Sequence, residues 1–147
     1  MTKYESYKFA FEQIDLAIES EFYLEAITIE ESIISDRLIS YLQLNGKTGD
    51  FSRIGLYQIV KKVGNVPGQY SIKVSENFLL TVDDWRNKRN TCIHQLVKSD
   101  KGEPTIDVEK FKNIAKETAK EGRILARQIS SWTTSQKRKR ERQSNAK

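Results

Sequence analysis

Residues 78–96 read FLLTVDDWRNKRNTCIHQL, and they contain the most informative helical pattern of the chain. On a helix that advances about 100° per residue, five apolar residues of this segment fall within about 40° of one line. They are Phe78, Val82, Trp85, Cys92 and Leu96. Arg89 lies inside this stripe, about 20° from the line. A buried cation needs a partner, so the segment predicts a buried helix that meets a carboxylate from another helix.

Residues 24–42 contain a second apolar stripe, and a charged residue interrupts it as well. Its apolar members are Leu24, Ile27, Ile34, Leu38 and Leu42, and Glu31 lies among them. We expect Glu31 to pair with Arg89, with Glu30 as the next candidate, because each buried charge needs an opposite one. Two interpretations stay open: the pair fixes the register of two helices in one chain, or the charges lie at a dimer interface. A further apolar strip on the far side of this helix favours a partner subunit; it contains Ala26, Ile29, Ile33 and Leu44.

The same period of about 3.6 residues recurs along the chain and predicts an all-α bundle of four or five helices. The expected helices cover residues 4–20, 20–45, 51–63, 76–99 and 107 onward. Ser20 and Ser75 are the expected N-caps of the second and fourth helices. Asn45–Gly46 and Gly64 are the expected stops of the second and third. Residues 65–74 are expected to form a loop or a brief hairpin.

The excess of positive over negative charge is confined to one end of the chain. The net charge is +5, and residues 137–147 (KRKRERQSNAK) contain six Lys or Arg residues against one acidic residue, so residues 1–136 sum to zero. We therefore expect a helical domain over residues 1–136 and a basic tail over residues 137–147, which is either disordered or a frayed helical extension. The tail is interpreted either as a solubilising end or as a non-specific tether for phosphates. Any nucleic-acid site on the body must be a local patch.

Composition excludes several classes of protein. Cys92 and His94 are the only residues of their kinds, so an internal disulfide cannot form and a zinc site within one chain is not expected. No uncharged apolar run has the length of a membrane span, and the first ten residues lack the apolar core of a signal peptide. We expect a cytoplasmic protein that uses no membrane, metal or cofactor.

His94 lies on the polar side of its helix, about 160° from Phe78 and about 140° from Arg89. Taken alone, it is interpreted as an exposed surface histidine. Two side chains that far apart do not reach one point on a regular helix. Arg89 and His94 can therefore act together only if the helix is distorted there or if a second chain completes the site.

Arg89–Asn90, three further residues and His94 match the Arg-polar-x3-His pattern of ribonucleases of the HEPN superfamily. The context is similar to that family as well: a small helical bundle, the motif late on a long penultimate helix, and a long final helix. Residues 25–38 (EAITIEESIISDRL) resemble the second helix of bacterial, prophage-type members. The resemblance covers residues 4–133 and implies a HEPN-like bundle that forms a homodimer.

The resemblance implies a metal-independent endoribonuclease whose two motifs meet in one cleft of the dimer. Members of that family use the ribose 2′-hydroxyl as the nucleophile, which leaves a 2′,3′-cyclic phosphate. Arg89 and His94 would be catalytic, because an arginine fork fits phosphate oxygens and a histidine can move protons near neutral pH. Asn90 and Glu31 would support them. RNA contacts are assigned to the cations Arg86, Lys88 and Lys98.

The resemblance also implies a role as a toxin or in phage defence, with an antitoxin or a regulatory protein as a further partner. Some toxins of the family carry a tyrosine two residues after the histidine, which a nucleotidyltransferase modifies. Leu96 stands there in this chain, so we do not expect that modification. Two alternatives stay open. One is a non-catalytic HEPN-like dimer that binds RNA or protein; the other is a helical assembly module outside the family, in which Arg89 and Glu31 only fix the register.

Overall fold

The computed structural model of the protein describes residues 1–72 and 77–146. Within these ranges the chain forms α1 (Lys3–Glu19), α2 (Tyr23–Leu44), α3 (Leu56–Gly64), α4 (Phe78–Gln95) and α5 (Val108–Asn145). The predicted all-α bundle is confirmed. None of these helices combines the length and the apolar character that crossing a membrane requires, over the residues that the structure describes.

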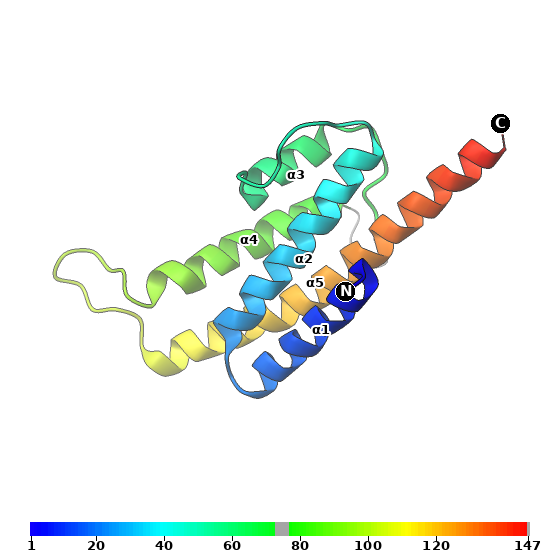
Figure 1. The fold of residues 1–147 in the computed structure, drawn as a ribbon. Helices are drawn as coiled ribbons and strands as arrows, with labels where there is room; N and C mark the ends of the chain where they lie inside the picture. The colour runs from blue at the N-terminus through cyan, green and yellow to red at the C-terminus, as the bar shows by residue number, and fades with distance from the viewer. Residues whose placement is uncertain (73–76, 147) are drawn as a thin grey trace.

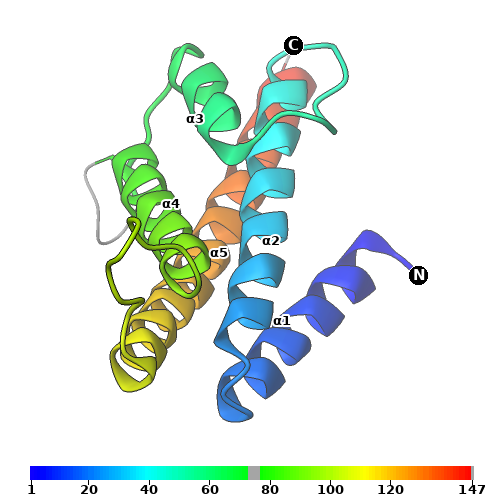
Figure 2. The same ribbon diagram turned by 90° about the vertical axis from the view of Figure 1, so that its left-hand side faces the viewer.

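α2 and α5 form the central pair and share the most extensive helix–helix contact (Figure 1). α1 packs on one side of this pair and touches both of its helices, whereas α3 and α4 lie on the other side (Figure 2). α4 contacts α5 chiefly, and it also reaches α2 and α3. The helix with the Arg–His motif is therefore held by the central pair.

The apolar stripe of α4 enters the core as predicted. Four of its members are buried: Phe78, Val82, Trp85 and Cys92. Leu96 is 39% exposed instead, because α4 ends at Gln95, before the predicted end at Ser99. The stripe thus directs the first four turns of α4 inward and leaves the last turn at the surface.

α2 buries two faces rather than one. The predicted stripe lies inside the bundle, with Leu24 only partly covered, and its buried members are Ile27, Ile34, Leu38 and Leu42. The strip that favoured a partner subunit is mostly covered within the chain: Ala26 is fully buried, Ile33 is 4% exposed, and Ile29 and Leu44 are partly buried. The reason is that α1 and α5 both pack on α2. This strip therefore gives no support to a dimer.

Aromatic rings close the core at the end of the bundle where α2 ends. Trp132 of α5 lies between Tyr41 and Phe78, with ring centroids 4.6 Å apart in both pairs. Tyr70 packs on the same cluster, and its hydroxyl donates to the carbonyl oxygen of Val63 at 2.7 Å. This bond holds the connection after α3 against the bundle. The predicted connection over residues 65–74 is described as far as residue 72.

α1 ends in a left-handed turn that the sequence pattern assigned differently. The N–H of Phe22 donates to the carbonyl oxygen of Ala17 at 2.8 Å, and the N–H of Glu21 donates to that of Ile18 at 3.1 Å. These two bonds form a Schellman motif, whose left-handed residue is Glu21 at φ 63°. Ser20 is the C-cap of α1, so its predicted role as N-cap of the next helix is wrong.

α2 ends in the same motif. The N–H of Gly46 donates to the carbonyl oxygen of Gln43 at 3.1 Å, and the N–H of Lys47 donates to that of Leu42 at 3.0 Å. Here the left-handed residue is Gly46, with φ 74°. The predicted stop at Asn45–Gly46 is confirmed, because glycine adopts this conformation without the clash of a Cβ atom.

Two helix starts differ from the prediction. α3 begins at Leu56 rather than at residue 51, because Oδ1 of Asp50 accepts the backbone N–H of Ser52 at 2.9 Å and holds a turn there. Its predicted end at Gly64 is confirmed. Asn77 is the N-cap of α4, and its side chain accepts the N–H of Leu79 at 3.0 Å. The predicted cap Ser75 lies outside the described residues.

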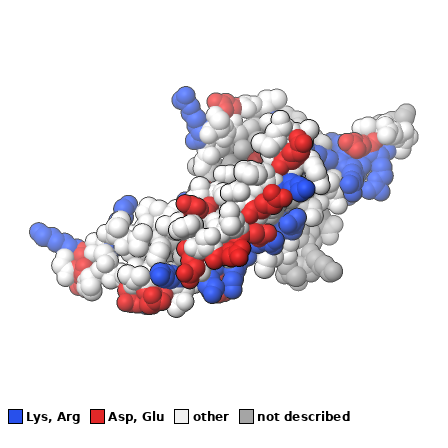
Figure 3. All heavy atoms as spheres, turned by 60° about the horizontal axis from the view of Figure 1, so that its bottom comes forward, with Lys and Arg blue, Asp and Glu red and all other residues white. Residues whose placement is uncertain are grey.

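α5 continues into the basic segment, for which a disordered tail or a frayed helical extension was expected. Its N-cap is Asp107, where the helix was expected to start, and it stays helical to Asn145, so its end projects from the bundle (Figure 1). Lys, Arg and Gln favour helices, cations stabilise a helix C-terminus, and extending a packed helix requires no new nucleus. Arg140 Nη2 also donates to Asn45 Oδ1 at 2.8 Å. Cationic side chains crowd this projecting end, whereas both signs of charge mix over the rest of the face in Figure 3.

Candidate functional site

The Arg89 guanidinium lies between α4 and α2, where it meets the Glu31 carboxylate. Nη2 of Arg89 donates to Oε1 of Glu31 at 2.5 Å. The Arg89 side chain is 19% exposed and that of Glu31 is 28% exposed, so water partly screens the pair. The predicted pairing of these two charges is confirmed.

Two contacts with α5 fix the rotation of α4 and thereby the position of Arg89. Trp85 Nε1 donates to the carbonyl oxygen of Thr118 at 2.9 Å, and Cys92 Sγ donates to the hydroxyl of Thr118 at 3.5 Å. Trp85 and Cys92 stand about one turn before and one turn after Arg89, and residues at this spacing share a face. They therefore carry Arg89 inward. Its Nε is buried and has no hydrogen-bond partner among the described residues.

His94 lies in the last turn of α4 and is exposed. Its Nδ1 is 3.3 Å from Nζ of Lys98, within hydrogen-bond distance. α4 is a regular helix as far as Gln95, so the distortion that could turn Arg89 and His94 toward one point is not observed. Arg89 faces α2 and His94 faces solvent. Within one chain, the two residues do not form a joint site.

Arg86 and Lys88, two of the three cations assigned to RNA contacts, lie on different sides of α4. The Arg86 guanidinium lies 4.9 Å from the ring centroid of Tyr57 of α3, and it pairs with Asp83 at 2.9 Å. Lys88 turns toward α5 and pairs with Glu121 at 2.8 Å. The structure therefore gives each of these cations an acidic partner and does not bring them together.

The surroundings of His94 are more apolar than the helix pattern indicates. Lys98, the third assigned cation, lies beside the histidine, and Asn90 is partly buried one turn earlier. Three large apolar side chains close to His94 in the chain are exposed: Ile93 by 44%, Leu96 by 39% and Val97 by 74%. Such a group of exposed apolar side chains is typical of a surface that another molecule covers.

Glu30, the second candidate partner of Arg89, is fully buried and unpaired. Neither carboxylate oxygen has a hydrogen-bond partner among the described residues. Gly122 of α5 makes room for it, since a Cβ there would lie 2.7 Å from Cζ2 of Trp85 and would also meet the Glu30 carboxylate. Desolvation raises the pKa of Glu30 to about 9, against a weaker opposing effect of Arg123. The carboxyl is therefore neutral at pH 7.

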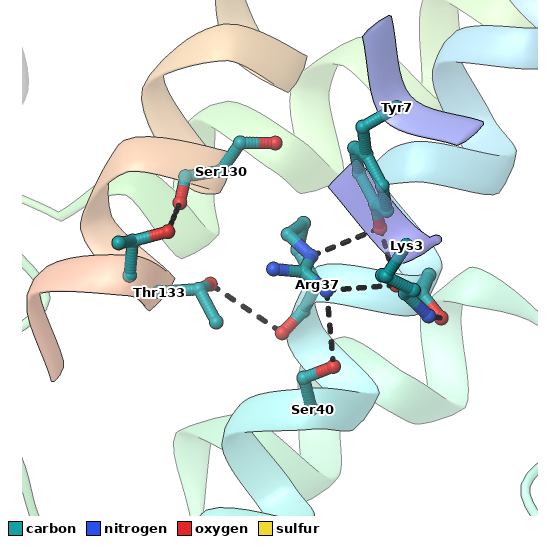
Figure 4. Close-up of polar contacts among 8 residues, drawn as sticks. Lys3, Tyr7, Arg37, Ser40, Ser130 and Thr133 are labelled. Atoms are coloured by element: carbon teal, nitrogen blue, oxygen red, sulfur yellow. Dashed lines mark hydrogen bonds and ion pairs between the residues drawn. The ribbon is translucent and has the colours of Figure 1, made fainter. Parts of the chain in front are cut away.

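A second polar cluster, absent from the sequence interpretation, joins α1 to α2 (Figure 4). Arg37 donates through Nε to the Tyr7 hydroxyl at 2.9 Å and through Nη2 to Asp36 at 3.1 Å. Tyr7 donates in turn to Asp36, as does Lys3 Nζ at 2.7 Å. Desolvation disfavours ionised Asp36, but the bonds from Lys3, Tyr7 and Arg37 outweigh it and lower the pKa of this carboxyl. The one available signal was the charged pair Asp36–Arg37 within an apolar helix.

Comparisons with protein families, with curated proteins and with solved structures found no match for this chain. Among the residues that the structure describes, no three His, Cys, Asp or Glu side chains are grouped so that they could hold a metal ion. None of these comparisons tests the resemblance to the HEPN superfamily, which stays a prediction from the sequence.

Proposed function

We propose that the protein is a metal-independent endoribonuclease of the HEPN type, with a composite active site in the cleft of a homodimer. The observation that carries this proposal is the bond between Arg89 and Glu31. It fixes a guanidinium late on α4 through Nη2, while Nη1 has no hydrogen bond within the described residues. A guanidinium that is held through Nη2 and keeps Nη1 without a bond is suited to bind a phosphate oxygen.

The exposed apolar side chains near His94 support the dimer. Ile93, Leu96 and Val97 stand in water in one chain, and a second copy of the chain would remove them from it. Such a contact would also bring the Arg89 of one chain toward the His94 of the other. The proposed dimer thus brings an Arg89 and a His94 together, which the regular geometry of α4 does not do within one chain.

In the proposed reaction the ribose 2′-oxygen forms a bond to phosphorus, and the bond from phosphorus to the 5′-oxygen breaks. His94 of one chain takes the proton of the 2′-hydroxyl, and His94 of the other chain gives a proton to the departing 5′-oxygen. Arg89 neutralises the charge that gathers on the phosphate oxygens. Asn90 orients the phosphate without competing for protons. The products are a 2′,3′-cyclic phosphate and a 5′-hydroxyl end.

A second candidate function is a non-catalytic helical dimer that binds RNA or a protein. One observation favours it: the cations of the motif segment are already engaged by Asp83, Glu121 and Glu31. In this alternative the Arg89–Glu31 bond fixes the register of α2 and α4 and takes no part in a reaction.

The two functions are separated by incubating the full chain with end-labelled RNA in EDTA. We expect cleavage that leaves 2′,3′-cyclic phosphate ends, and we expect His94→Ala to slow it by about 10²–10⁴-fold. Gln95→Ala changes the exposed neighbour of His94 and should cut at the wild-type rate. Equal cleavage by His94→Ala, a requirement for Mg²⁺ or a 3′-hydroxyl product would contradict the mechanism. RNA binding without cleavage would favour the second candidate.

A further inference from the structure

A cavity of about 820 Å³ lies between α1 and α5 and reaches Arg37 of α2. Its volume is that of sites that hold small organic molecules. Two acidic side chains line it, Glu12 and Asp15, and Asp15 is bound to Arg123. Five cationic side chains line it: Lys3, Lys8, Arg37, Arg127 and Arg138. The cavity is therefore positively charged, although the body of the chain as a whole is neutral.

Arg37 directs one free nitrogen toward this cavity. Its side chain is 10% exposed, and the bonds of Nε and Nη2 to Tyr7 and Asp36 fix its orientation. Nη1 forms no hydrogen bond within the described residues. In Figure 4 this nitrogen points away from Tyr7, toward the side of α5 on which Ser130 lies. A charged donor held by its other nitrogens is preorganised for an anion.

Hydroxyl groups of α5 face the same space. Oγ of Ser130 is buried and has no hydrogen-bond partner among the described residues. Ser131, Thr134 and Ser135 line the cavity as well. A buried hydroxyl without a partner costs free energy, which a ligand oxygen at this place would recover.

Two further arginines complete the cationic wall. The Arg127 guanidinium lies 4.2 Å from the ring centroid of Phe11, which supports it from the α1 side. Neither Arg127 nor Arg138 forms an ion pair within the described part of the chain. Arg127 still lies close enough to Asp15 to help lower the pKa of that carboxyl, but it keeps no direct bond to it and can turn its donors to a ligand.

We propose that this cavity binds a phosphate monoester, at a site separate from the one proposed for RNA cleavage. A monoester carries up to two negative charges on three terminal oxygens, which matches several cations together with hydroxyl donors. A carboxylate has two oxygens and one charge, and it would leave part of this donor set unmatched. The site lies along residues 127–138 of α5, whereas the part of α4 that carries the motif meets α5 at Thr118 and Glu121.

Calorimetric titration of the full chain tests the class of ligand. The probes are inorganic phosphate, ribose 5-phosphate, ribose and acetate. We expect both phosphates to bind, and neither ribose nor acetate to bind comparably. If acetate binds as tightly as phosphate, or ribose as tightly as ribose 5-phosphate, the proposal is overturned.

Variants then place the binding in this cavity. Arg127→Ala should weaken ribose 5-phosphate binding by about tenfold or more, and Ser130→Ala by about three- to tenfold. Ser130→Ala removes a hydroxyl that has no partner among the described residues, so the fold should tolerate it. Arg142→Ala, on the same helix but outside the cavity, should bind like the wild type. Unchanged binding in both cavity variants would overturn the proposal.

The phosphate can belong to a free small molecule or to the 5′ end of an RNA, and a second titration separates these sources. It compares a trinucleotide that carries a 5′-phosphate with one that carries a 5′-hydroxyl. A preference for the phosphorylated form that Arg127→Ala abolishes would identify an RNA end. Binding of ribose 5-phosphate without such a preference would identify a small molecule. Both results support the site, and failure of every phosphate probe to bind overturns it.

Discussion

Glu30 is the most deeply buried carboxyl group among the described residues. It is fully buried and forms no hydrogen bond within them. Burial raises its pKa to about 9, whereas an ordinary glutamate in an unfolded chain titrates near about 4.3. Between these two values the folded state binds more protons than the unfolded state. The contribution of Glu30 to the free energy of unfolding is therefore lost as the pH rises through this window.

Glu30→Gln should remove this pH dependence while keeping the shape of the side chain. We expect the variant to gain stability relative to the wild type by about 1.4 kcal/mol for each pH unit between about pH 5 and pH 8. Urea unfolding at several pH values measures this difference. Glu117→Gln, an exposed carboxyl on α5, is the control and should show no trend. A constant difference for Glu30→Gln would mean that the folded protein holds an ionised Glu30.

Glu31→Ala should destabilise the protein by about 1–3 kcal/mol, because it leaves the Arg89 guanidinium without its carboxylate. The loss is smaller than for a fully buried pair, since both side chains keep some contact with water. Chemical denaturation measures it. Glu25→Ala, on the exposed side of α2, should stay within about 0.5 kcal/mol of the wild type. An unchanged free energy of unfolding in Glu31→Ala would show that the ion pair contributes nothing to stability.

At the scale of the helices, α1 and α2 end in one motif with different residues at its left-handed position. The Cβ of Glu21 approaches the following carbonyl group in this conformation, which is sterically unfavourable. Gly46 has no Cβ and avoids this contact. Glu21→Gly should therefore raise the free energy of unfolding by about 0.5–1 kcal/mol. Thermal melts test this, with Glu21→Ala as a control that keeps the Cβ and should gain little. A loss of stability in Glu21→Gly would contradict the assignment of the motif.

The positions of the helices could be predicted because each one repeats apolar residues on one face. The wrong boundaries depend on local contacts that periodicity does not contain. Ser20 belongs to the turn that ends α1, and Asp50 holds Ser52 in a turn before α3. The basic end of α5 is helical because it extends a helix that is already packed, an effect that composition alone does not report.

Only the part of the candidate site whose charged residues interrupt an apolar stripe could be predicted from the sequence. Arg89 and Glu31 each interrupt a stripe, so their pairing followed from the sequence. The isolation of Glu30 did not, because it depends on how α2 is rotated against Gly122 and Trp85. The cluster of Tyr7, Asp36 and Arg37 joins residues about thirty positions apart, which no local pattern connects.

At the scale of the whole molecule, the proposed dimer should depend on the apolar surface near His94. Val97→Asp places a charge on that surface, so we expect it to shift the protein toward the monomer and to reduce RNA cleavage in parallel. Sedimentation velocity measures the association. Leu16→Asp alters an exposed apolar side chain of α1, on the other side of the central pair, and should leave both properties unchanged. A monomeric wild type, or a Val97→Asp dimer of wild-type strength, would rule out this interface.

The projecting end of α5 also gives the molecule a large electric dipole. The charges of residues 1–136 sum to zero and those of residues 137–147 to +5, and residues 137–145 form the last turns of a helix about 57 Å long. Near a polyanion, the electric field exerts a torque on this dipole and turns the basic end of α5 toward the polyanion before any surfaces touch. Encounters are then faster than for an evenly charged body, and they slow as added salt shortens the Debye length from about 10 Å at 0.1 M. The charge at one pole thus sets the orientation in which the molecule arrives.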